Sequence, residues 1–161
     1  MWCLFLLFVV TGGYLGNHML GSLFDSTLKR GRPPVVNTLE SDLTITERDG
    51  REISFSALRG KVSVVGYLYT ICPHGCATVI SEMKKLLDEH GTRSDFQLVS
   101  VTVVPERDTP EMLKGFAQAL GIKPSDPWWF LSGDHDLVDA YMSRELKLSP
   151  SKPIPEEERL N

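Results

Sequence analysis

The chain has 161 residues, 42% of them hydrophobic and 24% charged, which is the composition of one ordinary globular domain plus an appendage. The formal net charge of −4 and the lack of a long Lys/Arg block argue against nucleic acid as a partner. Three cysteines are too few for a scaffold built on disulfides, so the domain must depend on a hydrophobic core.

The N-terminal stretch has no charged residue from Trp2 to Phe24. It is long enough for a membrane-spanning helix, which needs about 20 residues, although only its first half is strongly apolar. We interpret residues 1–24 as a membrane anchor, with a cleaved signal segment as the alternative. The basic residues Lys29, Arg30 and Arg32 would by themselves place the side that follows the segment in the cytoplasm. Residues 25–37 are predicted to be a linker, and residues 38–161 the folded domain.

The first part of the domain shows β-type patterns. Leu43–Thr46 and Ile53–Phe55 flank Asp49-Gly50, a two-residue turn signal, and predict a β-hairpin. The run Val62–Tyr69 is nearly all apolar or β-branched, which predicts a strand covered on both faces. This strand leads directly into two of the cysteines.

Helical and strand patterns alternate in the rest of the domain. The predicted elements are a helix beyond Cys76 that shows its apolar spacing from Val79 to His90 and is ended by Gly91, a strand over Phe96–Val104, a helix starting at Asp108-Thr109-Pro110-Glu111, a strand over Trp128–Leu131 and a helix opened by Gly133-Asp134. The apolar side chains expected to face the core are Val79, Ile80, Met83, Leu86 and Leu87, then Met112, Leu113, Phe116, Ala117 and Leu120, then Leu137, Val138, Tyr141 and Met142. The alternation predicts an α/β fold with a mainly parallel sheet.

The candidate functional residues are Cys72 and Cys76, which lie between the long strand and the N-terminus of the next helix. Unpaired backbone N–H groups and the helix dipole favour thiolates there. Thiolates carry out redox chemistry and bind soft metals, so Cys72 and Cys76 are candidate metal ligands or a redox-active pair. A purely structural disulfide is the third alternative.

Several motifs occur in an order that resembles the SCO/SenC family over roughly residues 38–150. They are Gly66-Tyr67-x-Tyr69-Thr70-x-Cys72-Pro73-x-x-Cys76, then Val104-Pro105-Glu106-Arg107-Asp108-Thr109-Pro110-Glu111, then Trp129-Phe130-Leu131-x-Gly133. Members of that family are membrane-anchored, thioredoxin-like copper proteins involved in assembling the binuclear copper site of cytochrome c oxidase. The resemblance implies a thioredoxin-like fold, copper held by Cys72 and Cys76, and a copper-accepting oxidase subunit as partner.

The chain departs from the family pattern at three places. Ala77 stands where a proline is usual, and Val104 stands where an aspartate is usual. The family's metal-binding histidine, final hairpin and closing helix have no counterpart before Asn161, so we expect a truncated product or a fragment. Among the other histidines we expect His74 on a loop surface, His90 in helix capping or packing, and His135 in solvent, so none takes over the ligand role.

Two functional hypotheses follow. In the first, the protein is a copper-delivery factor that binds Cu(I) through Cys72 and Cys76 and passes it to an oxidase subunit by ligand exchange. In the second, it is a membrane-anchored thiol–disulfide oxidoreductase that uses the same pair on a partner's cysteines. An inactive fragment is the remaining alternative. Both hypotheses place the domain outside the cytoplasm, in the bacterial periplasm or the mitochondrial intermembrane space.

Overall fold

Five strands and three α-helices alternate along residues 34–71 and 76–151, the part of the chain that the computed structural model describes. The elements in order are β1 (Thr44–Glu47), β2 (Glu52–Ser54), the 3₁₀-helix η1 (Phe55–Leu58), β3 (Val62–Leu68), α2 (Cys76–His90), β4 (Phe96–Thr102), α3 (Pro110–Ala119), β5 (Trp128–Ser132) and α4 (His135–Arg144). Within these residues, no helix has the length and apolar character needed to cross a bilayer. The predicted anchor, residues 1–24, lies outside them.

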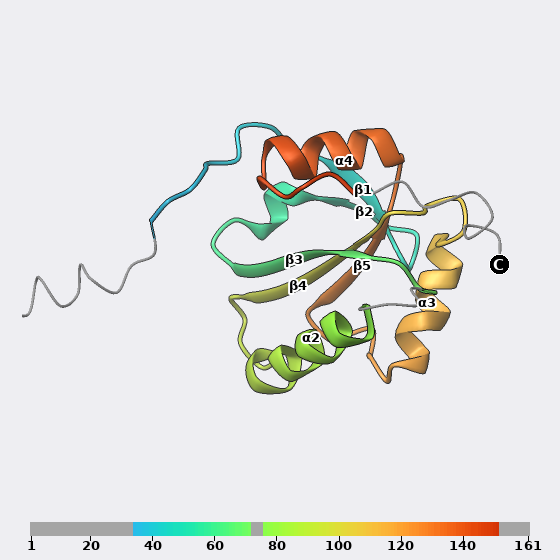
Figure 1. Ribbon diagram of the computed structural model, residues 1–161. Coiled ribbons are helices and arrows are strands. Elements are labelled where there is room, and N and C mark those ends of the chain that lie inside the picture. The colour runs from blue at the N-terminus through green and yellow to red at the C-terminus, as the bar shows by residue number, and fades with distance from the viewer. Residues whose placement is uncertain (1–33, 72–75, 152–161) are drawn as a thin grey trace, which may run out of the picture. The chain divides into compact units, whose positions relative to one another are not determined.

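The strands form one sheet in the order β2-β1-β5-β4-β3 (Figure 1). Strands β3, β4 and β5 are parallel to one another, whereas β1 pairs antiparallel with both β2 and β5. The predicted α/β fold, with an N-terminal hairpin and parallel central strands, is therefore confirmed. The carboxyl ends of β3, β4 and β5 consequently meet at one edge of the sheet, which we call the carboxyl edge.

The hairpin is present, but its turn is longer than the predicted two residues. Thr46 is paired with Glu52, and the N–H of Glu47 donates to the carbonyl of Arg51 at 2.8 Å, which leaves a three-residue loop, 48–50. Gly50 ends this loop with φ 86°. A type I turn followed by one left-handed residue is the standard three-residue alternative, so the glycine is used one position later than in a two-residue turn.

Strand β3 differs from the prediction in its burial. Every residue of β4 is buried, but β3 runs from an exposed Val62 through five half-buried residues to a buried Leu68. Among the described strands β3 stands at the edge of the sheet, next to β4 only. The apolar run therefore predicted the strand correctly, but the predicted covering of β3 on both faces is only partial.

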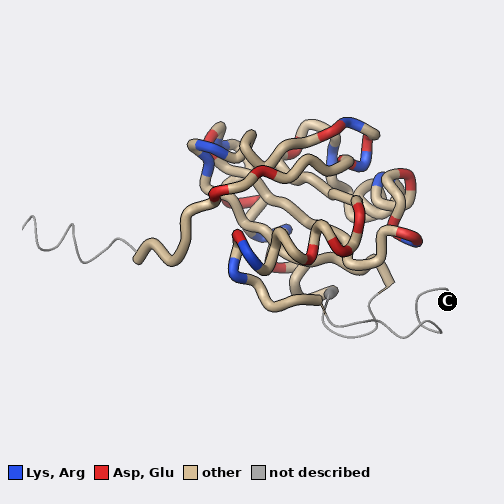
Figure 2. Tube along the Cα trace, turned by 90° about the horizontal axis from the view of Figure 1, so that it is seen from above, with Lys and Arg blue, Asp and Glu red and all other residues tan. Residues whose placement is uncertain are grey.

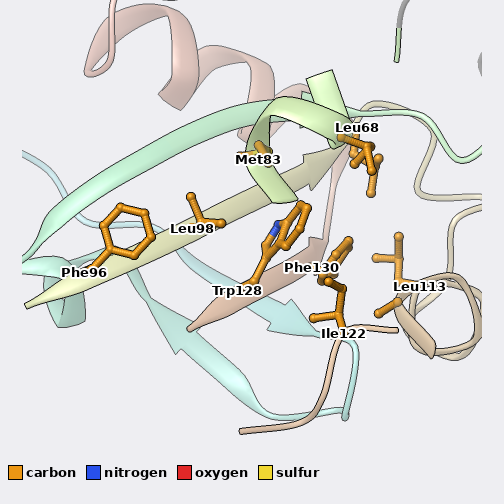
Figure 3. Packing of buried hydrophobic residues seen from close by; sticks show 10 residues of the cluster. Leu68, Met83, Phe96, Leu98, Leu113, Ile122, Trp128 and Phe130 are labelled. Carbon is orange, nitrogen blue, oxygen red and sulfur yellow. The ribbon is translucent and has the colours of Figure 1, made fainter. Parts of the chain in front are cut away.

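Two core layers pack on the two faces of the sheet. On one face, α2 and α3 cover a cluster centred on β4 and β5, in which Trp128 stacks on Phe130 with 5.0 Å between ring centroids (Figure 3). The indole Nε1 of Trp128 donates to Oγ of Ser100 at 3.0 Å, so its polar group is satisfied inside the core. On the other face, η1 and α4 pack on the sheet, and Phe55 meets Tyr141 edge-to-face at 5.0 Å.

Most of the predicted apolar stripes face these layers, but three residues do not. Val79, Met112 and Leu137 are 47%, 50% and 64% exposed. Each lies within the first four residues of its helix, and each of these helices follows a parallel strand, so its first turn lies at the carboxyl edge. The helical period is right, but at these three positions near the start of each helix the side chain remains exposed.

Candidate metal centre

The two candidate thiols belong to the connection between β3 and α2. Cys76 is the first residue of α2, whereas Cys72 and His74 lie outside the described residues, as does the side chain of Cys76. The prediction that the two sulfur atoms form one site therefore stays a prediction. The structure does place both ends of their loop at the carboxyl edge, where ligand sites of α/β sheets usually lie.

The ends of neighbouring strands are joined at this edge. The N–H of Val103, just after β4, donates to the carbonyl of Leu68, the last residue of β3, at 3.0 Å. Thr70 lies two residues beyond the end of β3 and two residues before Cys72. The groups around Thr70 therefore lie at the start of the connection between β3 and α2, residues 69–75, which carries Cys72 and which we call the thiol-bearing loop.

A buried carboxylate, that of Asp108, lies at the start of this loop and is fully shielded from solvent. Its Oδ1 accepts from the hydroxyl of Thr70 at 2.5 Å, and its Oδ2 accepts from the N–H of Thr70 at 3.2 Å and from the hydroxyl of Thr102 at 2.7 Å. The carboxylate thus links the loop after β3 to the last residue of β4.

Sequence reasoning missed this function of Asp108, because it assigned the Asp-Thr-Pro-Glu motif to the start of a helix. The helix start is correct, but Thr109 is the capping residue, and its hydroxyl accepts from the N–H of Met112 at 3.4 Å. Only one side chain is needed for that cap. Thr109 at the N-cap and Pro110 at the first helical position are already sufficient to start the helix. An acidic residue immediately before them is the signal that could have suggested a different structural function for Asp108.

An open hollow lies between the loops after β4 and β5. Its lining includes Glu106, Asp134, His135 and Asp136. His135 begins α4 as predicted, with its Nδ1 3.3 Å from Oδ1 of Asp136 and its Nε2 3.2 Å from Oγ of Ser151. The imidazole is partly exposed but is engaged on both nitrogens.

The described part of the domain holds no cluster of metal-binding side chains of its own. Those residues contain no group of three or more His, Cys, Asp or Glu side chains that could hold a metal ion. Val104, at the position where an aspartate is usual in the resembled family, is buried. His90 ends α2 and packs edge-to-face on Phe96 at 5.5 Å, which confirms its predicted packing function. A pair of thiolates suits a soft ion such as Cu(I) better than Cu(II).

Tyr67, on β3 just before this edge, does not supply a base. Burial raises its pKa to about 12, and the nearby carboxylate of Asp139, which accepts from its hydroxyl at 3.3 Å, acts in the same direction. The phenol is therefore neutral at physiological pH. Asp139 also accepts from the N–H of Ser151 at 3.0 Å, so it joins β3 to the chain that follows α4.

The fold and the position of the cysteine pair define a thioredoxin-like α/β protein with its candidate chemistry at the carboxyl edge of the sheet. The model of the family SCO1/SenC matches residues 32–153. This match covers well over half of the sequence, and the chain belongs to the SCO1/SenC family.

Two relatives and one solved structure illustrate the relationship. The SCO1 protein homolog of Bacillus subtilis (strain 168) is 30% identical over 120 residues, which are 71% of this chain and 60% of that protein. A putative copper-binding protein of Stutzerimonas stutzeri is 34% identical over 76 residues, which are 46% of this chain and 37% of that protein. The chain thus spans less than two thirds of the length of either relative.

The solved structure is that of BsSco, a member of the Sco family of cytochrome c oxidase assembly proteins in which a disulfide switch has been identified. It superposes with a TM-score of 0.65 at 26% identity, covering 75% of this chain and 71% of that one. This similarity confirms the predicted thioredoxin-like fold.

Proposed function

We propose that the protein binds Cu(I) through the thiolates of Cys72 and Cys76 and delivers it to a subunit of cytochrome c oxidase. The observation that carries this proposal is the position of the pair, between the end of β3 and the first turn of α2, in a chain of the SCO1/SenC family. The copper-binding name of the Stutzerimonas relative and the assembly function of BsSco support it.

The chemistry of the two cysteines suits the transfer of bound Cu(I) to another protein. Cys76 begins α2, where the positive end of the helix dipole favours the thiolate over the thiol. Two thiolates are sufficient ligands for Cu(I), and a low coordination number leaves room for an acceptor's thiolate or imidazole to enter before a donor leaves. Transfer then proceeds by ligand exchange, with the copper as substrate and no change in its oxidation state.

The exposed apolar side chains at the carboxyl edge support docking of a partner there. Ile71, immediately before Cys72, is 38% exposed, and Val79 and Met112 are exposed in the first turns of α2 and α3. Figure 2 shows acidic and basic residues interspersed over the described domain. Recognition would then rest on local contacts beside the thiols more than on long-range attraction.

The second candidate function is thiol–disulfide exchange, which the disulfide switch of BsSco favours. In such a reaction one thiolate attacks a partner's disulfide to form a mixed disulfide and releases one partner thiol. The other cysteine then displaces the second partner thiol, leaving Cys72 and Cys76 oxidised and the partner reduced. For either function we propose that residues 1–24 anchor the domain to a membrane on its non-cytoplasmic side, in the bacterial periplasm or the mitochondrial intermembrane space.

An anaerobic Cu(I) titration of the reduced full chain in detergent, in competition with bicinchoninate, tests the copper proposal. We expect one Cu(I) per chain, with binding lost when Cys72 and Cys76 are both changed to serine. Cys3→Ser is the matched control, because it removes a thiol from the N-terminal stretch and leaves the pair intact. Stoichiometric copper retained by the double variant would contradict the proposal. A folded wild type that exchanges disulfides but binds no copper would favour the second function.

A further inference from the structure

We propose that Asp108 is a positioning residue for the thiol pair, holding Thr70 in place and thereby setting the geometry of the loop that carries Cys72. This inference rests on the proposed use of the two cysteines. It adds to that function a residue that contacts neither copper nor a partner and acts only through Thr70.

Asp108 is itself held firmly by the elements around it. Its N–H donates to the carbonyl of Val104 at 2.8 Å, and Thr109 next to it caps α3. On the other side, the hydroxyl of Thr102 donates to its Oδ2 at 2.7 Å and accepts from the N–H of Val104 at 3.0 Å. The carboxylate is thus fixed between β4 and α3.

Thr70 is the residue that this fixed carboxylate orients. Its N–H and its hydroxyl donate to the two different oxygens, so the contact fixes both the position and the direction of the chain. If Thr70 moved away, the buried side chain of Asp108 would lose two hydrogen-bond donors without gaining water in their place. This cost favours the arrangement in which Thr70 stays hydrogen-bonded to Asp108. Only Ile71 separates Thr70 from Cys72, so a displacement of Thr70 is passed on to the first thiol.

The same carboxylate could serve the fold alone, and a matched residue separates the two possibilities. Ser100, also in β4, has a buried hydroxyl that accepts from Trp128 Nε1 and donates to Sδ of Met83 in the core, and neither of these partners is Thr70 or Asp108. Removal of either polar group costs stability. Only loss of the Asp108–Thr70 contact is expected to change the properties of the thiol pair.

The test measures Cu(I) affinity by chelator competition in four full-length variants, Asp108→Asn, Thr70→Val, Thr70→Ser and Ser100→Ala. Loss of groups that orient metal ligands typically weakens metal binding about 10- to 100-fold, and we expect a decrease of that size for Asp108→Asn and Thr70→Val. Thr70→Ser keeps the hydroxyl and should retain most of the affinity. Ser100→Ala should unfold at lower urea yet bind copper as the wild type does. Equal affinity in all four variants, or an equal loss in Ser100→Ala, would overturn the inference.

A second measurement keeps this inference separate from the proposed function. The Cys72–Cys76 pair is equilibrated with oxidised and reduced dithiothreitol, and forming its disulfide transfers two electrons and two protons to oxidised dithiothreitol. We expect the equilibrium constant to change in Asp108→Asn and Thr70→Val but not in Ser100→Ala. If the wild type binds no copper, the copper proposal fails while this comparison still decides the positioning function. Equilibrium constants equal to that of the wild type in all variants would refute the positioning function. If Asp108→Asn does not fold, Thr70→Val, a substitution at a half-buried position, still tests the contact.

Discussion

At the C-terminal end of α4, the carboxylate of Glu145 joins three donors. It accepts from the hydroxyl of Ser41 at 2.6 Å, from the N–H of Glu40 at 2.9 Å and from Nε of Arg144 at 3.0 Å. These hydrogen bonds, that of Ser41 foremost, lower the pKa of Glu145 to about 2. One side chain thereby attaches the segment before β1 to the end of the last helix.

The lowered pKa of Glu145 predicts a specific loss of stability in acid. The pKa of Glu145 has its ordinary value of 4.5 in the unfolded chain and is about 2 in the folded protein. As the pH falls between these values, the carboxylate is protonated in the unfolded chain but stays ionised in the folded protein. The stabilisation is therefore complete above pH 4.5 and is lost as the pH falls to about 2. We expect Glu145→Gln to unfold at lower urea than the wild type at pH 7, with a much smaller difference at pH 2.5.

The matched control for this prediction is Glu40→Gln. It makes the same chemical change at an exposed side chain whose backbone N–H, and not its carboxylate, takes part in the contact. Its urea midpoint should stay close to that of the wild type at both pH values. A gap between Glu145→Gln and the wild type that is equally large at both pH values would show that the carboxylate does not act through its ionisation.

Among the elements, α4 depends on a single capping side chain. The Oδ1 of Asp134 accepts from the N–H of Leu137 at 2.9 Å, in the first turn. We expect Asp134→Ala to reduce the free energy of unfolding by about 1 kcal/mol, the usual value of such a cap. Asp134→Asn should be nearly neutral, because asparagine caps equally well. Thermal unfolding followed by circular dichroism measures both, and equal losses in the two variants would indicate that charge, not capping, is what Asp134 contributes.

Elements with local signals could be predicted from the sequence. Asp49-Gly50 indicated the hairpin, Thr109-Pro110 the start of α3 and Asp134 the start of α4, since each acts through backbone groups within three or four residues. The length of the hairpin turn could not be predicted, because glycine suits the left-handed position of both turn types. Nor could the exposure of Val79 be predicted, because it depends on the tertiary packing around the first turn of α2.

The candidate site was predictable only in part, for the same reason. Cys72 and Cys76 are marked by their spacing and by the adjoining helix, and the use of their sulfur atoms stays a prediction. The Asp108–Thr70 contact joins residues 38 positions apart, and that of Glu145 with Ser41 spans 104 positions. No periodicity or short motif encodes partners at such separations; they follow from the order of strands in the sheet.

At the scale of the whole molecule, the two core layers share β4 and β5. Leu98 faces the layer under α2 and α3, and Leu131 faces the layer under α4, and both are fully buried. We expect Leu98→Ala and Leu131→Ala each to cost about 2–5 kcal/mol. Because damage to either face loosens the shared strands, tryptophan fluorescence and circular dichroism should report one coincident unfolding transition in each variant.

Leu137→Ala provides the control for this prediction, since the same truncation at a side chain 64% exposed should change the free energy of unfolding by no more than about 0.5 kcal/mol. Two separate transitions in Leu98→Ala or Leu131→Ala would mean that the layers unfold independently.

The antiparallel pairing of β1 with β5 also determines how this sheet is completed during synthesis. The hairpin leaves the ribosome early, yet its partner strand is made after β3, α2, β4 and α3. Until β5 emerges, the hairpin has no docking edge, and loop-closure entropy opposes contacts over such distances. The cysteines are therefore translated before the sheet can be completed, and a nascent chain must pass through an interval in which its thiols are present on an unfinished domain.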